Sequence, residues 1–345
     1  MPTIKDVAKE AGVSIATVSY VLNNKAAAVS EETRREVWRA VEKIGYMPNV
    51  TARNLRSSQS RLIGYAWHAP PPNGLLNDVL EHFTFFLAQA AEQAGYHLLT
   101  FTYPTDNPIR MYDELIRTGR VDGFILASTQ EHDTRIRYLL DKRFPFIAFG
   151  RSNPDWDFSW VDTDGEAGVR AAVDLLIKRG HTRIAMIAWD EGSLTGRFRF
   201  QGYAAALRQA GLSLRPDYIF RGEHSDRTGR DALTYWWAMP PDERPTAIFA
   251  ISDLIAVGVI HEAARCGIEI GRDLALIGHD NVPLSEFLSP PLATLEQPLD
   301  RIASALIENL CDVLAKPNGG KHPVRQVLIP PRLLVRASAN FVGDR

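Results

Sequence analysis

The segment TIKDVAKEAGVSIATVSYVLNN, residues 3–24, decides how the start of the chain folds. Thr3 and Asp6 have the spacing of a helix N-terminal capping pair, and Ser14 can cap a second helix eight residues after Asp6. Gly12 stands between the two helices, where a tight turn requires a residue that adopts a positive φ. The segment therefore predicts a helix-turn-helix.

The second helix of this motif has one apolar face and one small, hydroxyl-rich face. Val18 and Val21 continue the apolar stripe of the first helix. The opposite face carries Ile15, Ala16, Ser19 and Tyr20, with Thr17 beside it. A short capped helix with such a face fits a DNA major groove. Periodicity alone favours an amphipathic helical hairpin without a partner, because helix-turn-helix geometry is common and its pattern is weak.

A third helix and a polar linker follow. Ser30 can cap a helix with Glu31 and Glu32 in its first turn, and Gly45 ends it. Residues 46–60 then end in a Ser/Gln-rich stretch that is typical of a tether. Three helices of this length predict a small all-α headpiece with a marginal core.

Charge is unevenly distributed along the chain. The net charge is −2, yet residues 1–60 contain nine Lys or Arg against six Asp or Glu. A basic end on an otherwise acidic chain is typical of a module that binds phosphates.

Composition excludes several classes of protein. The 345 residues are 45% hydrophobic and 23% charged, which is typical of a soluble globular chain of two or three domains. No apolar run approaches the ~20 residues of a membrane span. Cys266 and Cys311 have no metal-site spacing and fit a reduced, cytoplasmic compartment. We therefore expect no membrane segment, no metal and no cofactor.

From Leu62 onward, apolar strand patterns alternate with helix patterns. Expected strands cover 62–67, 96–101, 123–127, 146–149, 184–188, 218–220, 246–250, 274–278 and a last one near 326–330. Expected helices lie near 77–94, 108–118, 132–142, 165–179, 197–210, 227–238, 253–266 and 299–315. Such alternation predicts two doubly wound α/β lobes with parallel sheets.

The pattern T-I-K-D-V-A-x-x-A-G-V-S-x-x-T-V-S-x-V-L-N resembles the start of the lactose-repressor/galactose-repressor (LacI/GalR) family of bacterial transcription regulators. Residues 175–187, 244–263 and 277–298 are similar to the family's effector domain, which folds like periplasmic sugar-binding proteins. The resemblance implies a repressor in the bacterial cytoplasm, associated with the nucleoid. Its partners would be near-palindromic double-stranded operator DNA, a small-molecule effector and a second copy of the chain.

The resemblance also sets the expected domain borders. A helix-turn-helix headpiece covers 1–46, and a hinge helix and linker cover 47–61. An effector-binding and dimerisation domain covers 62–345. Its first lobe is expected at about 62–160 plus 292–322, and its second lobe at about 161–290 plus 323–340.

The linker pattern Y-x-P-N-x-x-A-R-x-L resembles the family's hinge helix, which folds only on operator DNA. The resemblance implies that Leu55 wedges between base steps in the minor groove, with Ala52 at the close helix contact and Arg53 near phosphate. The full set expected to contact DNA is Thr3, Ile4, Lys5, Ser14, Ile15, Ala16, Thr17, Ser19, Tyr20, Asn23, Ser30, Thr33, Tyr46, Asn49, Ala52, Arg53 and Leu55.

Catalysis has no local signature in the chain. A P-loop, G-x-G-x-x-G, C-x-x-C, H-E-x-x-H and G-x-S-x-G are all absent from the sequence. We therefore expect no enzyme and no catalytic residues.

A binding cleft is expected beyond the carboxyl ends of the strands. Arg199 is at the position that resembles the family's effector-gripping arginine, and Asp280 matches the aspartate that takes paired sugar hydroxyls. Asp253 is expected to cap the helix that follows it. The candidate effector-binding residues are His68, Thr129, Arg151, Trp189, Arg199, His224, Ser252 and Asp280.

Arginine, carboxylate and hydroxyl groups beside aromatic faces suit a neutral polyhydroxylated ligand, most simply a mono- or disaccharide. Three alternatives stay open. The chain could be a sugar-binding or transport receptor, an enzyme built on the same lobes, or a regulator that responds to a corepressor or to a non-sugar effector such as a nucleobase.

Overall fold

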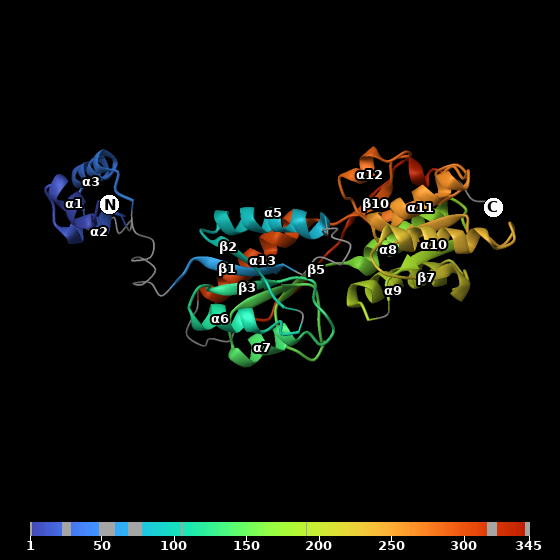
Figure 1. Cartoon of the computed structure of the whole chain (residues 1–345), viewed down its shortest axis with the longest axis horizontal. Coiled ribbons are helices and arrows are strands. Elements are labelled where there is room, and N and C mark those ends of the chain that lie inside the picture. The colour runs from blue at the N-terminus through green and yellow to red at the C-terminus, as the bar shows by residue number, and fades with distance from the viewer. Residues whose placement is uncertain are drawn as a thin grey trace. The chain divides into compact units, whose positions relative to one another are not determined.

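The computed structural model describes residues 2–22, 29–47, 59–67, 78–104, 106–190, 192–315 and 323–341. The chain forms two compact units, Met1–Ser60 and Arg61–Arg345, coloured along the chain in Figure 1. Each unit is described by itself. Within the described residues, no helix combines the length and the apolar character needed to span a bilayer.

The first unit contains the three expected helices. Helix α1 covers Ile4–Glu10, α2 covers Ile15–Leu22, and α3 covers Glu31–Ile44. Their apolar stripes meet in one small core, in which Val7, Val18 and Val37 are fully buried.

Local sequence explains how these helices begin and end. The Asp6 carboxylate accepts from the Thr3 backbone N–H and hydroxyl, both at 2.7 Å. Ser14 Oγ accepts from the Thr17 N–H at 3.0 Å. Gly12 has φ +65° in the turn, and Gly45 has φ +64° at the end of α3. The predicted helix-turn-helix is confirmed.

The second unit contains two six-stranded sheets, each with helices on both faces (Figure 1). In the first lobe the strand order is β11-β5-β4-β3-β1-β2, and all neighbours are parallel. Its strands are β1 Leu62–Trp67, β2 His97–Thr102, β3 Gly123–Leu126, β4 Phe146–Phe149, β5 Trp160–Thr163 and β11 Gln326–Ile329. Its helices are α5 Asp78–Gln93, α6 Arg110–Arg117, α7 Thr134–Lys142 and α13 Leu299–Leu314. Helices α5 and α13 share one face, and α6 and α7 cover the other (Figure 1).

In the second lobe the order is β12-β10-β9-β8-β6-β7. Its strands are β6 Ile184–Ala188, β7 Ile219–Arg221, β8 Ala247–Ala250, β9 Ala275–Asp280, β10 Ala293–Glu296 and β12 Arg332–Leu334. Its helices are α8 Gly165–Lys178, α9 Leu194–Gln209, α10 Asp226–Trp237, α11 Asp253–Arg265 and α12 Leu284–Phe287. Helix α8 packs on α9, and α10 packs on α11. Strands β6 to β10 run parallel, whereas β12 pairs antiparallel with β10 at the edge.

The lobe borders differ from those expected from the sequence. Strand β10 joins the second sheet although 292–322 was assigned to the first lobe, and β11 joins the first sheet although 323–340 was assigned to the second. Strand β5 extends the first sheet to residue 163. The chain therefore passes between the lobes three times, near 164, 297 and 331. Segments of four residues with mixed polarity carry too little periodicity to indicate which sheet they join.

Two glycines let α10 and α11 approach closely. A Cβ atom on Gly258 would lie 1.8 Å from the Asp226 carbonyl oxygen, and one on Gly229 would lie 2.0 Å from the Ile255 carbonyl oxygen. Both obstacles are backbone atoms, so no side chain can move aside.

We expect Gly258→Ala to lower the free energy of unfolding by about 2 kcal/mol or more, because the two helices must separate to admit a methyl group. Thermal denaturation of the purified chain measures the change. Gly192→Ala is the matched control, since its Cβ would have no atom within 4 Å. Equal melting temperatures for the two variants would contradict this close contact.

Candidate functional site

A cavity of about 300 Å³ lies between the two lobes of the second unit, at the carboxyl ends of their strands. We call it the interlobe cavity. Four of the residues predicted to bind an effector line it, namely Thr129, Arg151, Trp189 and Arg199. Its other lining residues are Val79, Leu80, Ser128, Gln130, Phe149, Gly150, Asp162, Thr163, Gly165, Ser193, Thr195, Phe198 and Gln297.

Arg151 follows β4 and contacts both lobes. Its Nε donates to Asp162 Oδ2 at 2.8 Å, and its guanidinium carbon lies 3.3 Å from the centre of the Phe198 ring on α9. Burial raises the pKa of Asp162, and the charge of Arg151 opposes this effect. Sequence reasoning missed both partners. Asp162 lies in the unexpected strand β5, and Phe198 gave no signal beyond its position next to Arg199.

Arg199 enters the cavity from α9 and is only 3% exposed. Its Nη1 donates to the Ile251 carbonyl at 2.7 Å, and its guanidinium carbon lies 5.0 Å from the centre of the Trp189 ring. Its Nε has no hydrogen-bond partner among the described residues. Burial lowers the pKa of Arg199, while nearby carboxylates act in the opposite direction.

Asp280 lies behind Arg199 and outside the lining of the interlobe cavity. Its Oδ1 is 3.8 Å from Arg199 Nη2 and is hydrogen-bonded to His279 Nδ1 at 2.9 Å and to Gln297 Nε2 at 2.8 Å. Burial acts to raise the pKa of Asp280, but these neighbours hold it below its usual value. Burial and Arg199 lower the pKa of His279 to about 4, so its ring is neutral at pH 7. Asp280 has φ +120°, a backbone conformation that these contacts must maintain.

Gln297 connects two of the three lobe crossings. Its Oε1 accepts from the Thr163 hydroxyl at 2.8 Å, while its Nε2 donates to Asp280. It lines the interlobe cavity and also a neighbouring hollow of about 520 Å³, in which Asp280 takes part. The side chain therefore joins the cavity wall to the segments that connect the two lobes.

Two other predicted residues, Ser252 and His224, are not in the lining of the cavity. Ser252 is fully buried, and its Oγ accepts from the Ile255 N–H at 3.4 Å to cap α11. His224 lies edge-to-face against Trp189, with ring centres 5.8 Å apart. His68 lies outside the described residues.

The capping role expected of Asp253 was wrong. Ser252 caps α11, and Asp253 instead holds the β9–α12 turn and β10. Its Oδ2 accepts from the Val282 N–H at 3.0 Å, and its Oδ1 accepts from the Thr294 hydroxyl at 2.6 Å. Burial and the charge of Asp280 raise the pKa of Asp253 to about 8.

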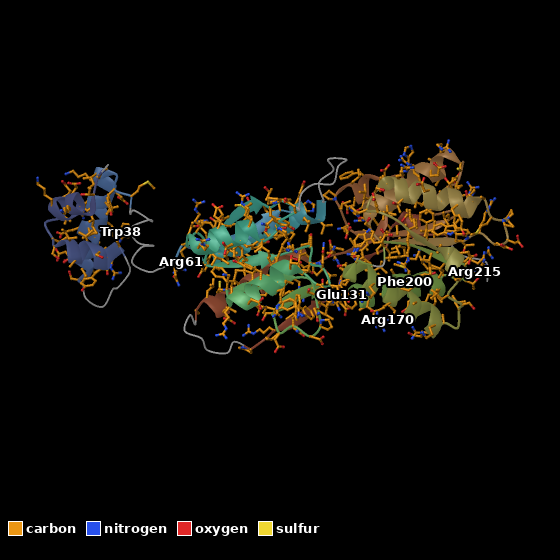
Figure 2. All side chains as sticks on the ribbon, turned by 60° about the horizontal axis from the view of Figure 1, so that its bottom comes forward. Trp38, Arg61, Glu131, Arg170, Phe200 and Arg215 are labelled. Carbon is orange, nitrogen blue, oxygen red and sulfur yellow. The ribbon has the colours of Figure 1, made fainter. Side chains whose placement is uncertain are left out.

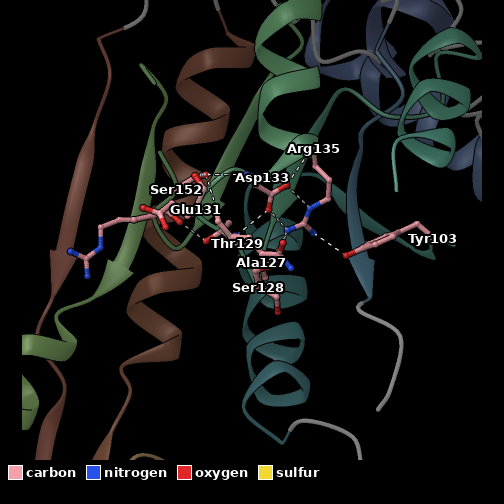
Figure 3. Close-up of polar contacts among 10 residues, drawn as sticks. Tyr103, Ala127, Ser128, Thr129, Glu131, Asp133, Arg135 and Ser152 are labelled. Carbon is pink, nitrogen blue, oxygen red and sulfur yellow. Dashed lines mark hydrogen bonds and ion pairs between the residues drawn. The ribbon is translucent and has the colours of Figure 1, made fainter. Parts of the chain in front are cut away.

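Loop 127–133, between β3 and α7, is held by a buried arginine (Figure 3). Arg135 donates to both carboxylate oxygens of Asp133, at 3.0 and 2.6 Å, and to the carbonyls of Ala127 and Ser128 at 3.1 Å. Its Nη1 also donates to the Tyr103 hydroxyl at 3.3 Å (Figure 3). This network supports the loop that presents Thr129 and Gln130 to the cavity.

The same loop carries Glu131, which lies where the two lobes meet (Figure 2). Glu131 pairs with Arg197 of α9, with Oε2 and Nη2 2.7 Å apart. Both side chains are about two-fifths exposed, so solvent screens this ion pair between the lobes.

The headpiece presents the predicted DNA-contacting face of α2. Ile15 and Tyr20 are each 45% exposed, Ala16, Thr3 and Lys5 are exposed, and Ser19 is half-buried. Ser14 and Ser30 accept from the backbone N–H groups of Thr17 and Thr33, and so act as helix caps. Ile4 and Tyr46 pack against the headpiece core. Asn23, Asn49, Ala52, Arg53 and Leu55 lie outside the described residues.

Comparison with known proteins agrees with this division of the chain. The family described as "Bacterial regulatory proteins, lacI family" matches residues 3–49, and the "Periplasmic binding protein-like domain" matches residues 173–339. The HTH-type transcriptional repressor PurR of Aliivibrio fischeri (strain MJ11) is 31% identical, covering 98% of each chain. The ribose operon repressor of Escherichia coli (strain K12) is 31% identical, covering 98% of this chain and all of the relative.

A solved structure is also similar. The regulatory protein of the LacI family from Chloroflexus aggregans is 42% identical, with a TM-score of 0.76, over 81% of this chain and 99% of that one. The chain belongs to the LacI family of bacterial transcriptional regulators. It is a DNA-binding repressor with an effector domain, and the relatives named above are transcriptional repressors rather than enzymes.

Asp253 makes the stability of the effector domain depend on pH. Its carboxyl binds a proton up to about pH 8 when folded but only up to about pH 4 when unfolded. Between these values the folded state binds more protons, so the stabilisation from this group is lost as pH rises, by at most about 1.4 kcal/mol per pH unit.

We expect Asp253→Asn to remove this dependence, because an amide does not titrate. Melting temperatures are measured at pH 5, 6.5 and 8. The melting temperature of the variant relative to that of the wild type should rise as pH rises. Asp231→Asn, at an exposed carboxylate of α10, is the control and should follow the wild type. A constant difference between Asp253→Asn and wild type at all three values would refute the assignment.

Proposed function

We propose that the chain represses transcription as a homodimer on a near-palindromic operator, and that a small polyhydroxylated molecule of the sugar class controls its operator affinity. The interlobe cavity is the observation that carries this proposal. Its wall brings Arg151 and Arg199 together with the faces of Trp189 and Phe198. Guanidinium groups beside aromatic rings suit a ligand with many oxygens and a partly apolar ring face.

The size of the cavity favours a monosaccharide over a disaccharide. About 300 Å³ is at the lower end of the volumes of small-molecule sites. One relative is a repressor of a ribose operon, which supports the sugar class. The alternative is a non-sugar effector or corepressor, such as a nucleobase stacked on Trp189.

The headpiece supplies base contacts from α2 and backbone contacts from its caps. Ile15, Ala16 and Tyr20 present apolar surface that suits thymine methyl groups. Ser14, Thr17, Ser30 and Thr33 provide hydroxyls near the helix N-termini, which suit phosphates. The proposal includes the predicted contacts of the hinge residues Leu55, Ala52 and Arg53 with operator DNA. It places the protein in the bacterial cytoplasm.

Two exposed apolar side chains on α12 support the proposal of a homodimer. Leu284 is 52% exposed and Phe287 is 82% exposed. Burial of such side chains against a partner is favourable, and a two-fold axis matches a near-palindromic operator. Sedimentation as a monomer at operator-binding concentration would contradict the homodimer.

Effector binding acts by changing how the two lobes meet. The contact of Arg151 with Phe198, the pair of Glu131 with Arg197, and Gln297 all join groups from both sides of the cavity. A ligand that contacts both walls changes the balance between lobe arrangements. By thermodynamic linkage, the effector changes the affinity for operator by a certain factor, and the operator changes the affinity for effector by the same factor.

We expect Tyr20→Ala to weaken binding to the operator at least tenfold while leaving binding to random DNA within about threefold, since base contacts carry discrimination of 1–3 kcal/mol. Gel-shift titration on both DNAs at one salt concentration measures this. Trp38→Ala is the control, because Trp38 is also 45% exposed but lies on α3. Equal losses on both DNAs would exclude base contact by Tyr20.

We expect Arg199→Ala to abolish the effect of ligand on operator affinity, because a cavity donor that fixes the ligand is lost. Operator binding is measured with and without D-ribose, other monosaccharides and hypoxanthine, and melting temperatures report whether the variant folds. Arg199→Lys provides a second variant that keeps the charge. Arg208→Ala, exposed on the same helix, is the control. If Arg199→Ala still releases the operator with the same ligand at the concentration that acts on the wild type, Arg199 is not part of the effector site.

A further inference from the structure

We propose that the effector carries an anionic group, a carboxylate or a phosphate, and that Arg151, Arg199 and Trp189 receive it in the interlobe cavity. This inference rests on the proposed function, because it assigns the chemical class of the ligand of that same site. It goes beyond a neutral sugar, and it follows from the hydrogen-bonding groups that the cavity leaves unused.

Arg151 has most of its donors unused. A guanidinium has five N–H groups, and the only one with a partner among the described residues is Nε, which donates to Asp162. Phe198 covers one face of the group at 3.3 Å. The four N–H groups on the two terminal nitrogens remain, in the fork geometry that matches two oxygens of a carboxylate or phosphate.

Two further donors in the cavity wall lack partners. Arg199 Nε and Trp189 Nε1 are both buried and have no hydrogen-bond acceptor in the described parts of the chain. Their side chains lie together, with the guanidinium carbon of Arg199 5.0 Å from the centre of the Trp189 ring. A buried donor without an acceptor is unfavourable, so a ligand that supplies acceptors removes this cost on binding.

The carboxylate of Asp162 and the amide of Gln297, two acceptors of the wall, are used internally. Asp162 Oδ1 accepts from the Thr163 N–H at 2.8 Å, and Oδ2 accepts from Arg151. Gln297 is bonded at both ends of its amide. Asp280, the carboxylate expected to take sugar hydroxyls, lies outside the lining and is bonded to His279 and Gln297.

The balance of the cavity therefore favours an acceptor-rich ligand. Two guanidinium groups and one carboxylate are in its lining. A neutral sugar must donate its hydroxyl protons as well as accept, whereas a carboxylate or phosphate only accepts. Opposite charge also favours an anion, because a guanidinium can form two parallel hydrogen bonds with one carboxylate or phosphate.

The test uses the full-length chain and matched ligand pairs at constant ionic strength. D-glucose is compared with D-glucuronate and with D-glucose 6-phosphate, D-ribose with D-ribose 5-phosphate, and inorganic phosphate serves as the minimal probe. We expect at least one charged ligand to raise the melting temperature more than its neutral parent. Comparison of the glucuronate arm with the phosphate-ester arms identifies which anion the site takes.

Variants separate the cavity from other anion-binding surfaces. In Arg151→Gln the charged ligand and inorganic phosphate should bind at least tenfold more weakly. If Arg151→Gln fails to fold because Asp162 is left buried without its partner, Arg151→Gln combined with Asp162→Asn removes both charges together. Arg137→Gln removes an exposed arginine of α7 and should leave the ligand-induced shift unchanged.

The outcomes distinguish this inference from the proposed function. If a neutral sugar or hypoxanthine releases the operator and the charged ligands have no effect, the effector is not anionic. The proposed function as a ligand-controlled repressor then still stands. A phosphate shift of equal size in wild type and Arg151→Gln also overturns it, since the anion then binds elsewhere. If Arg151 is required for anion binding but no ligand alters operator affinity, the anion site stands and the proposed control of repression fails.

Discussion

The arrangement of the second unit depends on one partly buried hydrogen-bonded junction, in which Gln297 is bonded to Thr163 and to Asp280. These three residues belong to three different segments, and each lies at or next to the end of a strand that faces the other lobe. A partly buried amide with both ends satisfied stabilises one geometry, whereas a half-satisfied one would cost free energy. The junction therefore joins the wall of the cavity, the neighbourhood of Arg199 and two of the lobe crossings.

The polar groups around this junction divide into two kinds. Asp253, Ser252 and Arg135 are satisfied within the protein and hold loops or helix ends in place. Arg151, Arg199 and Trp189 retain donors that no described residue of the chain satisfies. A protein that keeps such donors buried gives up stability to gain affinity, which is the usual cost of a preorganised site.

Much of the fold could be predicted because its signals are local. The caps at Ser14 and Ser30 and the positive φ of Gly12 depend on neighbouring residues only, and the strands with continuous apolar runs are buried on both faces. Four of the eight effector candidates line the cavity, because the side chain after a parallel strand lies at one edge of the sheet. Ser252 takes the capping role expected of Asp253, since the two residues are adjacent at the start of α11 and only packing decides which of them caps it.

The sequence by itself determined the three-helix headpiece, the two α/β lobes and the membership of the LacI family, because capping, periodicity and a dense motif are readable within short windows. Only the tertiary structure decided that β10 and β11 cross to opposite lobes, that Asp280 lies behind the cavity wall, and that Phe198 covers Arg151. Each of these depends on contacts between residues far apart in the chain. No local pattern encodes them, because the free energy that favours them comes from burial and hydrogen bonding that exist only after the lobes have formed.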